Sequence, residues 1–240
     1  MHLRVLLIIL IPFVSLASPV RSSDGGLGMQ FQMDIPDDPP LPDGVIAVEY
    51  IESTGQQWID TGIPYNSFTD EIKCSVEVTE VSQYGAVFGT FETINGTARY
   101  FAVRRFTSQN RWQIMAASSK TFGQDSLLLD TRYDICISPP PGYSSINEET
   151  FSTGSSQNFV FSLPIYVFAV RNSNNVSGQI NSCCRLYSYS HRRDGELLLD
   201  LVPVRVDDGD GNPVGCLYDC VSGDLFVNGS KVPFLVGPDL

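Results

Sequence analysis

The sequence has little positive charge: 15 Lys and Arg residues stand against 27 Asp and Glu residues, giving a formal net charge of −12 at pH 7. A nucleic-acid partner is therefore not expected, because binding to phosphates needs a positive field. Charged residues make up only 18% of the chain and hydrophobic residues 42%, which excludes a wholly disordered protein. No stretch has the 3.6-residue periodicity of an amphipathic helix. What remains is a β-rich globular protein, and 240 residues are enough for a sizeable core.

The longest apolar run lies at the N-terminus, from Val5 to Ala17, directly after Arg4. It is too short for a transmembrane helix, which needs about 20 residues. The small residues Ser15 and Ala17 fit a signal-peptidase site before Ser18. We therefore predict a signal peptide over 1–17, export to the cell surface or the medium, and no membrane insertion of the mature chain. An uncleaved N-terminal anchor is the alternative.

Residues 18–43 are rich in Ser, Gly, Asp and Pro and predict a flexible spacer. Residues 44–240 contain short runs of Val, Ile, Tyr, Phe and Thr, separated by Gly, Asn, Asp and Ser. Apolar residues at 72, 74, 76 and 78 have the strict period of two that is typical of a half-buried strand. The segment 159–170 is apolar on both faces and predicts a central strand, with a break or edge at Pro164. An Asp-Gly hairpin turn is expected over 193–196.

About a dozen such strands favour an all-β, antiparallel β-sandwich as one domain over 44–240. The cysteines agree with export, because an even number in an exported chain indicates disulfides. We predict at least two disulfides and leave their pairing open. A zinc site is the weaker alternative, because paired Cys-x-x-Cys spacing is absent and His191 is the only histidine after the signal peptide. The six cysteines are Cys74, Cys136, Cys183, Cys184, Cys216 and Cys220.

The segment DGVIAVEYIESTGQQWIDTGI, residues 43–63, resembles the opening of concanavalin A-like (LamG-like) jelly-roll domains of bacterial and phage surface proteins. Residues 185–189, 195–205 and 215–219 are similar to the closing hairpin of those domains. The resemblance implies a concanavalin A-like jelly roll, in which ligands bind on the concave sheet or at rim loops. It also implies a calcium ion at the sheet rim as an option. These motifs describe strands and turns, so they say little about function.

Catalytic residues are not evident. Glucanases of this superfamily place carboxylates on one strand as Glu-x-Asp-x-x-Glu, and no Glu of this chain begins such a string. Glu77 and Glu80 are an odd number of residues apart and would face opposite sides of a strand. A Ser-His-Asp triad would need His191, which we expect at the surface beside the Asp-Gly turn. The sequence therefore predicts that the chain is not an enzyme.

A ligand-binding surface is expected along residues 99–106. Strand alternation places Tyr100 and Arg104 on one face, opposite residues 99, 101, 103 and 105, which we expect to face the core. Arg104 should be accessible, because an unpaired buried charge is costly. Trp112 on the next strand and Trp58 are candidate stacking partners for sugar rings; the alternative is that both are core residues.

Asp208, Asp210 and Asn212 alternate as in a calcium loop, and Asp219 falls twelfth. However, Pro213 occupies the sixth position, where such loops have glycine. The alternative is an acidic hairpin turn. No other cofactor is predicted.

Two functions fit these observations. The first is a secreted or cell-surface, non-catalytic binding module for carbohydrate. The second is a structural or adhesion domain of an envelope, appendage or phage-derived assembly that contacts another surface protein.

Overall fold

The computed structural model describes residues 40–80, 85–106, 110–117, 119–139, 143–147, 149–152, 159–172 and 182–240. The predicted signal peptide (1–17) and most of the predicted spacer (18–43) lie outside these residues. The described segments form strands and no helix, and accordingly none of them contains a helix suited to crossing a membrane.

The larger sheet has eleven strands. Eight of them neighbour one another in a fixed order: β11 (Glu149–Ser152), β10 (Tyr143–Ile146), β9 (Arg132–Ile137), β4 (Asp70–Val78), β14 (Cys183–Arg193), β15 (Glu196–Asp207), β16 (Pro213–Asp219) and β17 (Leu225–Phe226). Three short strands complete this sheet. They are β1 (Ile46–Ala47), which pairs with β15, and β2 (Ile51–Thr54), which pairs with β14 and with β18 (Leu235–Val236).

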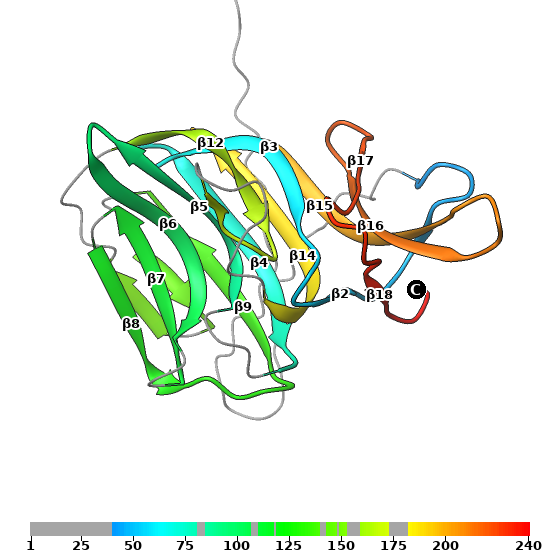
Figure 1. Ribbon diagram of the computed structural model, residues 1–240, viewed down its shortest axis with the longest axis horizontal. Helices are drawn as coiled ribbons and strands as arrows, with labels where there is room; N and C mark the ends of the chain where they lie inside the picture. Colours follow the sequence, from blue (N-terminus) through cyan, green and yellow to red (C-terminus); the bar gives the residue numbers. More distant parts are fainter. Residues whose placement is uncertain are drawn as a thin grey trace, which may run out of the picture. The chain divides into compact units, whose positions relative to one another are not determined.

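The smaller sheet has seven strands, in the order β3 (Ile59–Asn66), β12 (Val160–Val167), β5 (Ala86–Ile94), β6 (Thr97–Phe106), β7 (Arg111–Ala117) and β8 (Ser119–Ser126), with β13 (Arg171–Asn172) beside β5. The β13–β5 pair is parallel; the other pairs of described strands are antiparallel. Figure 1 shows the two sheets as two layers. The predicted all-β, antiparallel sandwich is confirmed.

The core lies between the layers, because each sheet turns one apolar face inward. Phe88 and Phe101 of the smaller sheet are fully buried, with ring centroids 5.9 Å apart. Phe88 also meets Tyr189 of the larger sheet edge-on, at 6.0 Å between ring centroids. On β4, residues 72, 74, 76 and 78 are 0–4% exposed, which confirms the period of two as the core-facing pattern.

Two local predictions are also confirmed. Asp194 and Gly195 both have positive φ (52° and 82°), and Arg193 pairs with Glu196, as in a two-residue hairpin turn. The predicted central strand is β12, which lies between β3 and β5. Its register against β3 shifts on both sides of Pro164, because proline cannot donate to the ladder.

Four of the six cysteines are buried, and two of these, Cys74 and Cys184, belong to the core cluster. Among the described residues, no disulfide is formed, and across the sheet Cys74 has Tyr189 and Ile135 as its neighbours. Burial raises the pKa of the Cys74 thiol well above its usual range and that of Cys184 to about 12, which disfavours the reactive thiolate. The disulfide prediction therefore gains no support from the geometry and stays a prediction.

Candidate functional site

The face of β6 that carries Tyr100 and Arg104 is closely packed at its centre. Both side chains lie on this face, but Ala102 between them is only 1% exposed and packs in an apolar cluster with Met115 and Val170. The Nε atom of Arg104 donates a hydrogen bond to Oε1 of Gln113, at 2.6 Å. Tyr100 and Arg104 therefore share a face, as alternation predicts, but this apolar cluster separates them.

Neither tryptophan has an open ring face for a sugar. Trp112 pairs with Arg105 across β6 and β7, is 4% exposed, and belongs to the core cluster. It therefore lies on the side of the sheet opposite Tyr100, which confirms the alternative of a core residue and corrects its place as a candidate stacking partner. The ring of Trp58 stacks on Tyr166 at 4.5 Å between centroids, and a Cβ added at Gly229 would lie 2.2 Å from its Cη2 atom.

His191 is fully buried, which corrects the expectation of a surface turn histidine. The strand continues to Arg193, so His191 lies inside β14 rather than in the turn. Its Nε2 atom is 2.9 Å from Oδ2 of Asp70, and Arg193 donates to both oxygens of the same carboxylate, at 2.7 and 2.9 Å. These three side chains form the Asp70 network, which joins β4 to the end of β14.

Burial alone would raise the pKa of Asp70. Hydrogen bonds from Arg193, His191 and the backbone N–H of Asn66 outweigh that effect and lower the pKa from 3.8 to about 2. A pKa that is lower in the folded than in the unfolded state stabilises the fold above the unfolded value.

We therefore expect a pH-dependent contribution from Asp70. It should be fully present above about pH 4 and lost as the pH falls through about 2, because the unfolded chain then binds the proton more readily. Its size should be about 2 kcal/mol, at roughly 1.4 kcal/mol for each tenfold change in proton affinity. Urea unfolding of the wild type and of Asp70→Asn between pH 2 and 6 measures it. A stability difference between the two proteins that does not shrink in acid would contradict this assignment.

The candidate calcium residues form a self-contained turn between β15 and β16. Asp208 accepts hydrogen bonds from the backbone N–H groups of Asp210 and Asn212 and from the Asn212 side chain, which lower its pKa. Asp219 lies at the other end of β16, where it pairs with Leu201. The twelve-residue loop is therefore not formed. Among the described residues, no group of three acidic, His or Cys side chains is placed to hold a metal.

The sequence leaves calcium binding at this turn as an option, and the structure does not test it. Because the turn satisfies its own carboxylate, we expect the melting temperature to stay within about 1 °C when millimolar calcium replaces EDTA. Calcium at about 100 times its Kd would instead add about 2.7 kcal/mol, or several degrees in a domain of this size. Differential scanning calorimetry distinguishes the two results.

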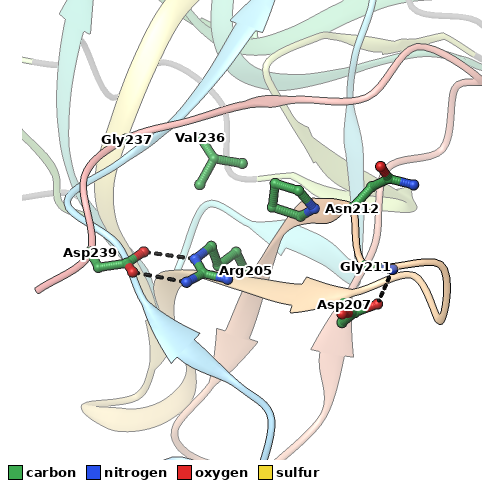
Figure 2. Close-up of a pocket in the computed structure, with 8 residues that line it drawn as sticks. Arg205, Asp207, Gly211, Asn212, Val236, Gly237 and Asp239 are labelled. Atoms are coloured by element: carbon green, nitrogen blue, oxygen red, sulfur yellow. Dashed lines mark hydrogen bonds and ion pairs between the residues drawn. The ribbon is translucent and has the colours of Figure 1, made fainter.

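A pocket lies beside this turn (Figure 2). Its volume is about 430 Å³, within the range of small-molecule sites. Arg205 donates from Nε and Nη2 to the two carboxylate oxygens of Asp239, at 2.7 and 2.8 Å. This pairing raises the pKa of Arg205 and lowers that of Asp239. The lining residues, called the Arg205 pocket below, are Arg205, Asp207, Gly211, Asn212, Pro213, Val236, Gly237 and Asp239.

Several polar atoms of the Arg205 pocket are left for a ligand. Asp207 accepts hydrogen bonds from the N–H groups of Gly209 and Gly211 with Oδ1, at 2.7 and 2.9 Å, and no group among the described residues donates to its Oδ2 atom. Within the described part of the chain, no protein group accepts from Nη1 of Arg205. The pocket thus offers a charged donor and a charged acceptor, both on side chains fixed by other hydrogen bonds.

Sequence reasoning missed Arg205 and Asp239. Arg205 ends the segment 195–205 that resembles the closing hairpin, but Asp239 lies 34 positions further on and belongs to no motif. The only signal in the sequence is the acidic turn over 207–212, whose alternating Asp and Asn residues suggest calcium ligands rather than one side of a pocket.

Comparisons with known proteins find only distant structural similarity. No family model matches the sequence, and no curated protein does. Among solved structures, Trypanosoma rangeli sialidase in complex with sialic acid is 14% identical over 53% of this chain, with a TM-score of 0.39. A mutant of that sialidase with trans-sialidase activity is 13% identical over 55%, with a TM-score of 0.39. The same sialidase with a difluoro-KDN ligand is 10% identical over 66%, with a TM-score of 0.41.

This chain spans 21%, 23% and 33% of those three structures. The prediction that the chain is not an enzyme is wrong by this comparison, because the similar structures are sialidases. We withdraw that prediction. A likeness with TM-scores below 0.5 assigns no catalytic residue, mechanism or substrate to this chain.

Proposed function

We propose that this chain is an exported, glycan-binding domain of the concanavalin A-like jelly-roll type, and that the Arg205 pocket holds a sugar. The observation that carries the proposal is the open donor and open acceptor in one pocket. A sugar hydroxyl can accept from Nη1 of Arg205 while the same or a neighbouring hydroxyl donates to Oδ2 of Asp207. Pro213 and Val236 supply apolar surface for the C–H groups of the ring.

Preorganisation supports the same function. Asp239 fixes the guanidinium of Arg205 through two hydrogen bonds, and the turn backbone fixes the carboxylate of Asp207. Side chains that are already held lose less conformational freedom when a ligand binds. The pocket also lies beside a hairpin turn at the end of β15 (Figure 2), in keeping with the rim loops that the family resemblance implies.

A glycan array followed by titration calorimetry on the best ligand tests the proposal. We expect Arg205→Ala to weaken binding by roughly 10- to 150-fold, because a hydrogen bond to a charged group contributes about 1.5–3 kcal/mol. The Arg205 side chain is 29% exposed and that of Asp239 is 52% exposed. Ion pairs at the surface contribute little to stability, so the variant should stay folded.

Asp210→Asn is the matched control, since Asp210 lies in the same turn but does not line the pocket. It should bind as the wild type does. Unchanged binding by Arg205→Ala would contradict the site. The absence of any glycan ligand would overturn the function and favour the alternative, a structural or adhesion domain that contacts protein.

A further inference from the structure

We infer that the Arg205 pocket selects amine-bearing and neutral sugars and rejects carboxylated ones. This inference rests on the proposed function and names the class of glycan that the pocket takes. It follows from the charges that surround the pocket and from the atoms that remain open in it.

Among the described residues, Arg205 is the only cation that lines the pocket. Its Nε and Nη2 atoms, which form one side of the guanidinium, are both committed to Asp239. A second carboxylate could pair only with the Nη1–Nη2 end of the guanidinium, which keeps unused N–H donors. Only the remaining side of the guanidinium is available, and its charge is already offset by Asp239.

The turn between β15 and β16 adds negative charge beside the pocket. Beyond the Arg205–Asp239 pair, the turn places Asp207 and Asp208 next to each other. Asp207 acts on Arg205 electrostatically, and the pKa of Asp208 is lowered by its hydrogen bonds to the turn, so that carboxylate is ionised at neutral pH. The pocket therefore has a negative field, in a chain whose formal net charge is −12. Such a field attracts cations and repels anions.

The Oδ2 atom of Asp207 can only accept hydrogen bonds when the carboxylate is ionised. A hydroxyl satisfies it with a neutral hydrogen bond, and an ammonium group satisfies it with a stronger, charge-assisted one. A carboxylate has no proton to donate and would be repelled. The expected order of affinity is therefore amine-bearing, then neutral, then carboxylated sugars.

A glycan array at pH 6 and low ionic strength tests this order. It would carry chitosan oligomers as the amine-bearing probes, cello- and manno-oligosaccharides as the neutral ones, and oligoglucuronates and sialylated lactose as the carboxylated ones. We expect the binders to come from the first two classes, with at least tenfold weaker binding of every carboxylated probe.

Two variants distinguish a direct contact of the ligand with Asp207 from the general effect of negative charge in the turn. Asp207→Asn keeps an oxygen for the turn but replaces the open oxygen by an amide donor, so it should abolish the preference for amine-bearing over neutral probes. Asp210→Asn removes the same charge without touching the pocket and should change that preference less than threefold. If carboxylated probes bind best, the inference is wrong while the glycan function stands. If no probe of any class binds, both fail together.

Discussion

Replacing Asp70 by Asn should lower the free energy of unfolding by about 3 kcal/mol, the lower end of the range for breaking a buried ion pair, because Asp70 is buried while the Arg193 side chain is 33% exposed. Asp70 is fully buried and accepts hydrogen bonds from Arg193 and from the backbone of Asn66, with His191 Nε2 at 2.9 Å. In the variant, the guanidinium of Arg193 loses its carboxylate counter-charge, and the buried imidazole of His191 loses its carboxylate neighbour. Chemical denaturation at pH 7 measures the loss.

Glu71→Gln is the matched control for that variant. Glu71 is the next residue on β4 and pairs with Lys73 at 2.9 Å, but both side chains are partly exposed, at 30% and 56%. We expect a loss of at most about 1 kcal/mol there. If Asp70→Asn is no more destabilising than Glu71→Gln, the Asp70 network does not hold β4 and β14 together.

Replacing Gly89 by Ala should cost about 3 kcal/mol of stability, at the upper end of the range for overpacking a core. A Cβ at this position would lie 2.6 Å from the backbone oxygen of Phe101 and 2.7 Å from Cβ of Ala102. Gly89 pairs with both β6 and β12 in the interior of the smaller sheet, so the backbone cannot move aside cheaply. Thermal and urea unfolding of the variant check this value.

The double variant Gly89→Ala/Ala102→Gly distinguishes the two obstacles. It removes the Cβ of Ala102 but leaves the carbonyl oxygen of Phe101 in place. We expect only a small recovery of stability. Full recovery would show that side-chain crowding, and not the close approach of two backbones, requires glycine here.

Local patterns were sufficient to predict much of the fold. The alternation over 72–78 and the Asp194–Gly195 turn depend on residues that are neighbours in sequence, so their physics is visible in the sequence. The β8 strand (119–126) was not predicted, because its Lys, Gly, Gln and Asp residues have low strand propensity. It pairs with β7 along the edge of the smaller sheet, and that pairing is not visible locally.

The two segments that resemble the ends of a jelly roll prove to be neighbours. Glu52 pairs with Arg185 between β2 and β14, and Nε of Arg185 donates to the Glu52 carboxylate at 2.8 Å. Arg185 also donates to Glu77 of β4, at 2.6 Å. These partly buried contacts join the opening of the domain to its closing strands, which gives the two distant motifs one structural role.

The candidate site was harder to predict, because it depends on which distant segments meet. The period of two placed Tyr100 and Arg104 on one face, but it could not show that Ala102 between them is buried in one apolar cluster with Val170. The burial of Trp112 and His191, and the meeting of Arg205 with Asp239, likewise follow from tertiary pairing rather than from spacing.

Chemical-shift mapping by NMR tests the central claim most directly. An ¹⁵N-labelled domain would be titrated with the best saccharide from the array. We predict that the largest backbone shifts cluster at Gly211, Asn212, Gly237 and Asp239, and that the Arg205→Ala variant does not show them. Shifts centred on Tyr100 and Arg104, with the Arg205 pocket unchanged, would contradict the account.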